Sequence, residues 1–549
     1  MNTACLLLLF FLLPHAAAEP FVPGQALDQG LVVNVTATTF AFVSPRTLTP
    51  EPIPRLARWG LRGLTALDAR LSTETEDETG TIALLQDRQP LLSRPRPAAD
   101  DAMGWGLLFG QFVRTAWDSS DSVRRAGTQG IIRVCLNEML THLDPYSRYA
   151  PPGDAERDRS RRAGRAGIGV TVAHGGGGFI IAGVTADSPA AQAGIQSGER
   201  ILAIDGQTAQ GADLASLNAL LAGPVGTRVV LTLRGGSRTG SDDKAQGAPR
   251  GARGPGNKDR SAAATRVRDI PLVRALVPPE TVSASRLGPL LVLRVSSFSS
   301  DTGSRFAHEI TRGLGGAHPP KGLVVDLRGN RGGLLRQAVT AAGALIADGP
   351  VANTAGRDPA AAHEFRAEGS DLARALPVVV LVDGHTASAA EILAAALADR
   401  GRAVVVGSST LGKGLVQTIT PLPDGGELLI TWSRVLAPLG WPIQGLGVLP
   451  QLCTSMGEES VARQQDELAG GHSVMSRAIE QERQARPPVS PALALEIRNA
   501  CPAAEGSGLD LATARWLIDH PQAYVSALIP PPLGATAAAT TQNMTSATP

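Results

Sequence analysis

The first residue whose type and setting could do chemistry is Lys413, in the glycine-rich stretch GSSTLGKG at residues 407–414. A phosphate-binding loop would carry serine or threonine after this lysine, to hold magnesium, and would open a helix. Gly414 follows instead, and the next residues alternate as in a β-strand. The pattern therefore argues against a nucleotide site, and it leaves Lys413 as either a salt-bridging surface residue or a base.

A second candidate is Ser388, which stands where an apolar run turns into the helix-forming stretch SAAEILAAALADR. At a helix N-terminus the free N–H groups and the helix dipole favour developing negative charge, so this serine could act as a nucleophile. The segment from Ser388 to Glu391 also fits a capping box, in which the serine only caps the helix. Position alone leaves both roles open.

The elements that must hold these residues alternate between strands and helices from residue 265 onward. This order predicts an α/β core with a mixed sheet that is buried on both faces. Residues 53–143 instead carry apolar residues at helical spacing, between polar and proline-rich stretches, which predicts a helical N-terminal region. Residues 456–528 are mostly helix-forming as well.

Residues 167–234 change character and resemble a PDZ domain, most strongly in DSPAAQAGIQSGERILAIDGQ at 187–207. The resemblance implies that successive backbone N–H groups capture the C-terminal carboxylate of a peptide, which adds as a strand beside them. The loop residues in question are Gly167, Ile168, Gly169 and Val170. Leu217 and Leu220 would shape the side-chain pocket. The alternative for the loop is a plain strand flanked by glycines.

Residues 377–435 as a block resemble the carboxy-terminal processing peptidases, also called tail-specific proteases. In that family a serine in a Thr/Ser-Ala-Ser turn is followed by Gly-Lys-Gly and then by a glutamine four residues after the lysine. The matching residues here are Ser388, Lys413 and Gln417. Three further blocks, LDPYSRY, KGLVVDLRGNRGGLLRQAV and PIQGLGVLP, extend the resemblance over about residues 100–452. The chain departs from the family at Arg331, Ala390 and Gln451, none of which replaces a catalytic group.

The resemblance implies a serine endopeptidase in which Ser388 attacks a carbonyl and neutral Lys413 accepts its proton, with Gln417 orienting the amine. Such a base needs a pKa lowered by roughly three units from about 10.4, which burial can supply. The oxyanion donors would be the backbone N–H of Ala389 and one from Gly332 or Gly333. No cofactor is implied, and without His-Glu-x-x-His or Cys-x-x-Cys spacing we expect no catalytic metal.

Two other functions stay open at this stage. The first is a catalytically inactive, PDZ-containing scaffold that binds peptides, which the intact serine, lysine and glutamine disfavour. The second is a trypsin-like PDZ protease, which the strand-helix alternation disfavours, as does Arg331 in GNRGG, where a nucleophilic serine would have to stand.

The N-terminus carries an apolar run of about ten residues followed by three alanines, the pattern of a secretory signal cleaved after Ala18. A membrane span would need roughly twenty apolar residues. We therefore expect a secreted, periplasmic protein with no stable membrane span. Of the three cysteines that remain, Cys453 and Cys501 are expected to form a disulfide with Cys135 left over; three unpaired cysteines are the alternative.

Charge and composition complete the expected organisation. Lysine and arginine number 51 against 50 acidic residues, so no nucleic-acid partner is indicated. The expected partners are proteins or peptides with exposed C-termini, and a homo-oligomer or an adaptor protein stays open. The predicted order is a signal peptide at 1–18, an N-terminal helical region at 19–155, a PDZ domain at 160–235, a disordered insertion at 236–264, an α/β serine peptidase core at 265–455, a helical C-terminal region at 456–529 and a disordered tail at 530–549.

Overall fold

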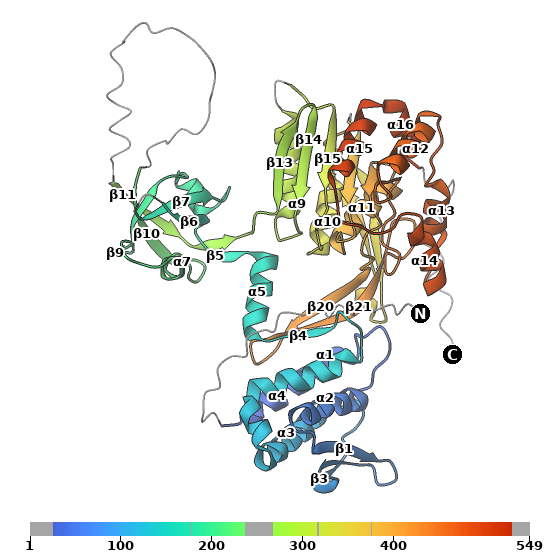
Figure 1. The fold of residues 1–549 in the computed structure, drawn as a ribbon. Coiled ribbons are helices and arrows are strands. Elements are labelled where there is room, and N and C mark those ends of the chain that lie inside the picture. Colours follow the sequence, from blue (N-terminus) through green and yellow to red (C-terminus); the bar gives the residue numbers. More distant parts are fainter. Residues whose placement is uncertain (1–25, 176, 236–266, 316–317, 375, 530–549) are drawn as a thin grey trace, which may run out of the picture. The chain divides into compact units, whose positions relative to one another are not determined.

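The computed structural model describes residues 26–235 and 267–529, except 176, 316–317 and 375 (Figure 1). The expected signal peptide, the 236–264 insertion and the 530–549 tail lie outside the described residues. The chain divides into two compact units, each described by itself below. The first is Met1–Pro152 with Thr418–Thr431, and the second is Gly153–Gln417 with Trp432–Pro549.

Four helices form the core of the first unit: α1 (Gln29–Val43), α2 (Ile53–Leu67), α3 (Ala102–Ser119) and α4 (Asp121–Thr141). Helices α2 and α4 approach closely at Gly63, which has no side chain. A Cβ atom at this position would lie only 2.6 Å from the Cα atom of Cys135. Cys135 is buried, and burial raises the pKa of its thiol to about 12. The apolar periodicity of this region thus produced the expected helices.

The stretch between α2 and α3 lies in the region that was expected to be helical, yet it forms an antiparallel sheet. Its strands are β1 (Leu71–Glu76), β2 (Thr81–Gln86) and β3 (Gln89–Pro95). The middle strand buries Ile82 and Leu84, whereas most side chains of β1 and β3 are exposed or half-buried. Because the outer strands carry few apolar residues, their sequence gives little strand signal.

The LDPYSRY block forms a turn organised by one carboxylate. Asp144 Oδ1 accepts the N–H groups of Tyr146 and Ser147 at 2.8 and 3.0 Å and the hydroxyl of Thr431 at 2.8 Å. The turn leads into β4 (Arg148–Ala150), which pairs with the first residues of β21 (Glu427–Leu436).

In the second unit, α5 (Pro152–Ala163) and β5 (Arg165–Gly167) precede a PDZ sheet with the strand order β11-β10-β8-β7-β6. The strands are β6 (Val170–His174), β7 (Phe179–Val184), β8 (Arg200–Ile204), β10 (Arg228–Arg234) and β11 (Val267–Val273), with helices α6 (Pro189–Gln192) and α7 (Leu214–Leu221) beside them. The core of this domain is apolar and includes Phe179, Ile204, Leu217 and Leu231.

Strand β11 corrects one expectation about the chain path. The insertion at 236–264 was expected to separate the PDZ domain from the protease core. The strand that follows it instead pairs along its whole length with β10, from Arg228 opposite Val273 to Arg234 opposite Val267. The PDZ sheet therefore continues beyond residue 235. The pairing could not be inferred locally, because the two strands are separated by a long stretch without large apolar residues.

The protease core is built on a six-stranded sheet with the order β13-β14-β15-β18-β19-β22. The strands are β13 (Val282–Leu287), β14 (Leu290–Val295), β15 (Gly322–Asp326), β18 (Val378–Val382), β19 (Val404–Gly407) and β22 (Leu452–Cys453). All neighbours from β14 to β22 are parallel, and β13 is the antiparallel edge, so the expected mixed sheet is confirmed.

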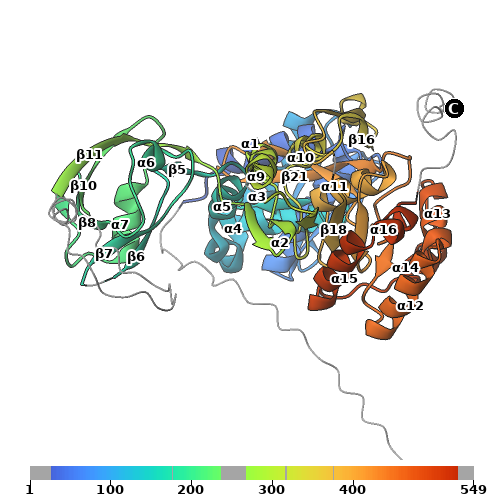
Figure 2. The same ribbon diagram turned by 90° about the horizontal axis from the view of Figure 1, so that it is seen from above.

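Both faces of this sheet are covered (Figures 1 and 2). Helices α9 (Thr302–Leu314), α10 (Leu335–Gly343) and α11 (Ala389–Asp399) pack on the face to which Val378 and Val380 belong. Helices α12 (Glu458–Ala469), α15 (Gly508–Asp519) and α16 (Pro521–Ala527) cover the face with Val379 and Leu381. All five residues of β18, VVVLV, are apolar because successive side chains point to opposite faces of the sheet and both faces are buried.

A second sheet has the order β17-β16-β21-β20 and includes β16 (Asp348–Ala355), β17 (His363–Glu368) and β20 (Leu415–Pro421). The remaining helices, α13 (Ser476–Gln484) and α14 (Pro491–Asn499), belong to the C-terminal segment. A disulfide joins Cys453 to Cys501, as expected from the sequence. In the part of the chain that the structure describes, no helix is long and apolar enough to cross a membrane.

Candidate active site

Ser388 lies at the N-cap of α11, directly after the tight turn that follows β18. Its φ is 58°, which is unusual for a residue other than glycine and costs energy unless the surroundings impose it. Here the surroundings do so. Asp383 Oδ1 accepts the N–H groups of His385 and Thr386 at 3.0 and 2.9 Å, and Ala387 donates to the carbonyl of Asn330 at 2.9 Å. The turn therefore holds Ser388 in a strained conformation.

Gly332 is packed against this serine. A Cβ atom at residue 332 would lie 2.7 Å from the Cβ atom of Ser388 and 2.9 Å from the backbone nitrogen of Ala389. With φ at 93°, only glycine fits here without strain. The loop after β15 therefore reaches the start of α11, and it brings together the residues that were expected to form an oxyanion hole.

The two glycines differ in what their N–H groups do. The N–H of Gly332 donates to Asn330 Oδ1 at 2.8 Å. Gly333 forms a bridge with Phe298 that uses the N–H groups of Phe298 and Leu334, so its own N–H is not part of that bridge. Within the described ranges no acceptor is recorded for the N–H groups of Gly333 and Ala389. These two groups are the ones that remain for a ligand.

The carboxylate of Glu391 ties the serine to the lysine. Its Oε2 accepts the backbone N–H of Ser388 at 2.7 Å and that of Lys413 at 2.9 Å. The other oxygen, Oε1, accepts the Thr410 hydroxyl at 2.5 Å and the Gly412 N–H at 2.7 Å. Because one oxygen binds both backbone nitrogens, Ser388 and Lys413 are adjacent in space although 25 residues apart in sequence.

Glu391 is fully buried. Burial raises the pKa of its carboxyl, while the four donors to its oxygens act in the opposite direction. The sequence pattern identified this residue only as a capping partner. Two of its three contacts with the segment around Lys413 are made by backbone N–H groups, which leave no signature in the sequence.

Gln417 lies on β20, and its side chain is half-buried. Its Nε2 donates to the carbonyl of Leu415 at 3.3 Å. Gly412, one of the two glycines at which a bend was expected, has a φ of 86°, but it precedes Lys413 and does not bend the chain between Lys413 and Gln417. Gly414 passes so close to Gln444 that a Cβ atom there would lie 2.2 Å from its backbone nitrogen.

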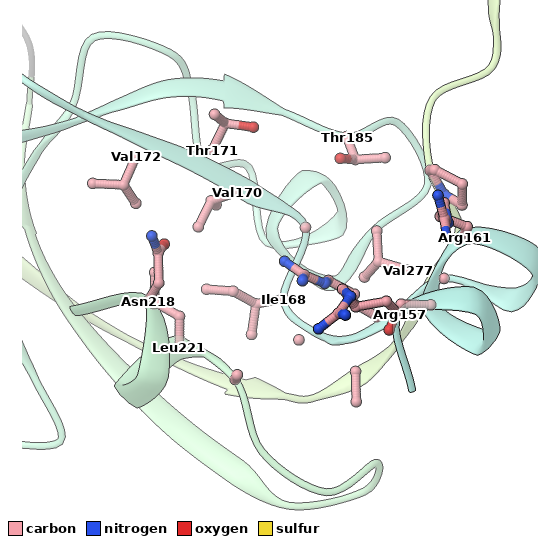
Figure 3. A pocket seen from close by; sticks show the side chains of 18 residues that line it. Arg157, Arg161, Ile168, Val170, Thr171, Val172, Thr185, Asn218, Leu221 and Val277 are labelled. Atoms are coloured by element: carbon pink, nitrogen blue, oxygen red, sulfur yellow. The ribbon is translucent and has the colours of Figure 1, made fainter. Parts of the chain in front are cut away.

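The expected peptide-binding loop lines a cavity of about 710 Å³ (Figure 3). Ile168 and Gly169 accept hydrogen bonds from Ala190 and Thr185 through their carbonyls. No acceptor is recorded among the described residues for the N–H groups of Ile168 and Gly169. The geometry is thus compatible with a carboxylate ligand at this loop.

The side chains of helix α7 that line this cavity are not Leu217 and Leu220, the two that were expected. Leu217 is buried in the core of the domain and Leu220 is not among the residues that line the cavity; Asn218 and Leu221 line it instead. The helical repeat explains the difference, because each residue is turned by about 100° from the one before it. Leu217 faces the sheet, and the next residue, Asn218, faces the cavity.

The cavity also has a basic wall that the sequence did not reveal. Arg157 and Arg161 of α5 and Arg165 of β5 line it, and none of the lining residues is acidic. Figure 3 shows Arg157 and Arg161 beside Ile168 and Val277. Arg157 and Arg161 each also pair with an aspartate three residues earlier, Asp154 and Asp158.

The described part of the chain contains no group of three or more His, Cys, Asp and Glu residues that could hold a metal ion.

Comparisons with known proteins agree with this architecture. Residues 289–453 match the model of peptidase family S41, and residues 180–235 match that of a PDZ domain. The carboxy-terminal-processing protease of Bartonella bacilliformis is 33% identical over 328 residues, which cover 59% of this chain and 69% of the relative. The carboxyl-terminal-processing protease of Synechocystis sp. is 31% identical over 355 residues, which cover 63% and 74%.

Among solved structures, the photosystem II D1 C-terminal processing protease is 26% identical and covers 74% of this chain and 97% of its own, with a TM-score of 0.34. The sheet, the serine turn and the PDZ domain define a serine peptidase with an added peptide-binding fold. The chain belongs to the carboxy-terminal processing protease family.

Proposed function

We propose that this enzyme is an extracytoplasmic endopeptidase with a Ser388/Lys413 dyad, and that its PDZ domain captures the C-terminal tails of its substrates. The observation that carries the dyad is the Glu391 oxygen that binds the backbone nitrogens of both residues. This arrangement brings the backbones of Ser388 and Lys413 together at a helix N-terminus.

In the proposed reaction the neutral amine of Lys413 accepts the proton of the Ser388 hydroxyl as its oxygen attacks the scissile carbonyl. The N–H groups of Ala389 and Gly333 stabilise the resulting oxyanion, since the Gly332 N–H already donates to Asn330. The ammonium of Lys413 then protonates the leaving amine, and a water molecule hydrolyses the acyl-enzyme by the same route. Gln417 orients the lysine amine.

Tail capture is supported by the chemistry of the PDZ cavity. N–H groups of Ile168 and Gly169, three arginines and the lack of lining carboxylates favour a negatively charged group. A peptide C-terminus carries such a group and can add as a strand beside β6. The expected secretory signal and the Cys453–Cys501 disulfide support a location outside the cytoplasm.

The test compares wild type with Ser388→Ala, Lys413→Ala and the control Lys321→Ala, an exposed lysine, in casein hydrolysis and thermal unfolding. We expect both site variants to lose turnover with nearly unchanged melting temperatures, and chelators to have no effect. If Ser388 only caps α11, its alanine variant loses about 1 kcal/mol of stability and stays active. Turnover retained by Lys413→Ala contradicts the dyad, whereas a wild type without turnover would leave the peptide-binding scaffold as the remaining function.

A further inference from the structure

The C-terminal helical segment follows the part of the chain that matches the peptidase family model, which ends at residue 453. One of its side chains nevertheless contacts the segment that carries Lys413. Arg498, on α14, donates from Nη1 to the carbonyl of Thr410 at 2.9 Å and to that of Leu446 at 2.8 Å. A single guanidinium nitrogen thus links two loop segments.

Gly447 makes room for this contact. A Cβ atom at residue 447 would lie 2.8 Å from Nη1 of Arg498 and 2.7 Å from the carbonyl oxygen of Thr410. The φ of Gly447 is 77°. Gly447, the second glycine of the PIQGLGVLP block, therefore lets the arginine reach the loop.

Thr410 connects the arginine to the candidate active site. Its hydroxyl donates to Glu391 Oε1 at 2.5 Å and accepts the N–H of Val448 at 2.8 Å. Glu391 in turn holds the backbone nitrogens of Ser388 and Lys413. An uninterrupted series of hydrogen bonds therefore runs from Arg498 to both residues.

The chain just after α14 is fastened on the same side of the core. Cys501 is bonded to Cys453, and its carbonyl accepts the hydroxyl of Ser409. The hydroxyl of Ser408 donates to the carbonyl of Ala504 at 3.0 Å and accepts its N–H at 3.1 Å. The C-terminal segment thus holds three successive residues of the lysine-bearing loop, 408, 409 and 410.

Residues 408–414 belong to neither a helix nor a strand. No regular ladder holds them, only separate backbone hydrogen bonds such as those from Leu411 to Thr386 and from Gly445 to Gly412. Side chains that bind the loop therefore add to its position. Glu391 binds the loop from inside the core, and Arg498 binds it from the C-terminal segment.

We propose that Arg498 is a positioning residue for the catalytic lysine: by fixing the carbonyl of Thr410, it keeps Lys413 in register with Ser388. This inference rests on the proposed Ser388/Lys413 dyad. Lysine should replace the arginine only in part, because its ammonium sits on a flexible stem and lacks the fixed plane in which Nη1 of the guanidinium donates to both carbonyls. A displacement of 1 Å in a catalytic group can lower the rate about 100-fold.

The experiment measures kcat, KM, the pH–rate profile and the melting temperature of full-length wild type, Arg498→Gln and Arg498→Lys. The control is Arg486→Gln, since Arg486 is also in the C-terminal segment and also donates to main-chain carbonyls, but those of Leu439, Arg483 and Ala485. We expect Arg498→Gln to lower kcat about 10- to 100-fold with KM within about twofold of wild type. Arg498→Lys should fall in between, and the control should match wild type.

The pH–rate profile separates positioning from a purely structural role. A loosened loop exposes the Lys413 amine to water, which favours its charged form, so the rising limb of the profile should move to higher pH. A wild-type kcat and profile in Arg498→Gln overturn the proposal, as does a lower kcat with an unshifted profile. If Arg498→Gln does not fold, the kcat and the pH–rate profile of Arg498→Lys decide between the two roles in the same way.

Lys413→Ala, measured in parallel, tells the two levels of proposal apart. If it is inactive while Arg498→Gln behaves as wild type, only the role of Arg498 is wrong. If Lys413→Ala is active, the dyad itself is wrong, and the inference falls with it.

Discussion

At the scale of single residues, the site depends on a buried carboxylate that the chemistry does not consume. Glu391 offers two oxygens to four donors. One oxygen accepts the N–H groups of Ser388 and Lys413, and the other accepts the Thr410 hydroxyl and the Gly412 N–H. An ionised carboxylate suits this setting because it accepts at both oxygens and donates at neither. The geometry of Ser388 and Lys413 therefore rests on the ionised form of Glu391.

Replacing Glu391 with glutamine tests this dependence. The amide keeps one acceptor oxygen but turns an NH₂ group toward two donors, which leaves those donors unsatisfied inside the protein. We expect kcat to fall at least about 100-fold. Steady-state kinetics of Glu391→Gln measure this, with Glu459→Gln as the control because the wild-type Glu459 side chain is 90% exposed. An unchanged kcat in Glu391→Gln contradicts the role assigned to Glu391.

Gly332→Ala should abolish turnover by filling the space beside Ser388 and the Ala389 N–H. A suitable control is Gly329→Ala. Gly329 also has a positive φ, 72°, but a Cβ atom there meets nothing within 4 Å. Both variants bear the strain of about 1 kcal/mol in unfolding free energy, but only Gly332→Ala should lose activity. Equal kcat values in the two variants would mean that the space beside Ser388 is not used.

Sequence reasoning found the residues with reactive side chains and missed those that act through the backbone. Ser388 and Lys413 stand in recognisable turns, and the structure brings them together. Glu391 and Arg498 could not be assigned, because most of the groups that link them to the lysine loop are carbonyl and N–H groups far away in the chain. Every residue type carries these groups, so no pattern of letters reveals the contact.

At the scale of elements, strands buried on both faces were easy to predict and half-exposed strands were not. Strand β18 is a run of five apolar residues, all buried. Strand β3 has mostly exposed side chains and lies in the region that was expected to be helical. Strand β11 shows a third case, in which the partner strand, β10, lies on the other side of a long insertion.

The disulfide between Cys453 and Cys501 should stabilise the C-terminal segment considerably. The two cysteines are 48 residues apart, and closing a loop of that length in the unfolded chain is worth about 4 kcal/mol. We expect reduction, or the Cys453→Ser/Cys501→Ser double variant, to lower the unfolding free energy by about 2–5 kcal/mol. Denaturant titrations with and without reductant measure it, and coincident midpoints would contradict it.

Helix α13 carries a second buried carboxyl, Glu482, which accepts the N–H of Leu449 at 2.9 Å. Burial raises its pKa well above the usual 4.5. The folded state therefore binds this proton more tightly than the unfolded state does, and stability falls as the pH rises from about 4.5 toward the raised value.

Glu482→Gln removes that dependence and keeps the acceptor for Leu449. Its melting temperature should decline less than that of wild type between about pH 5 and about pH 8. Thermal unfolding across this range is the measurement, with Glu459→Gln as the exposed control. Parallel curves for wild type and Glu482→Gln would show that the carboxyl does not titrate there.

At the scale of the whole molecule, the proposed function joins two activities, recognition of a tail and cleavage of a bond. Recognition is assigned to a cavity with N–H donors and a basic wall, and cleavage to the turn of Ser388. Each can be removed alone. Because the PDZ sheet includes β11, a clean removal of that domain spans residues 167–273 and not 167–234.

Tail recognition predicts that a long substrate with a free C-terminus is cleaved faster than the same substrate with an amidated one, whereas a short peptide shows no difference. Arg157→Gln/Arg161→Gln should raise KM for the free-acid substrate only, while Arg159→Gln, whose wild-type residue does not line the cavity, should not. Competition kinetics with matched acid and amide substrates measure the effect. Equal rates would leave the dyad intact but remove the preference for tails.

The pairing of Arg234 with Val267 has a practical consequence. These two residues face each other at the end of one antiparallel ladder, so whatever joins them leaves and re-enters the domain at the same spot. The connection can therefore be shortened to an Asn-Gly turn, which suits such a ladder, or exchanged for a reporter protein with neighbouring termini. This hairpin end gives a place to tag the enzyme without altering the register of β10 and β11.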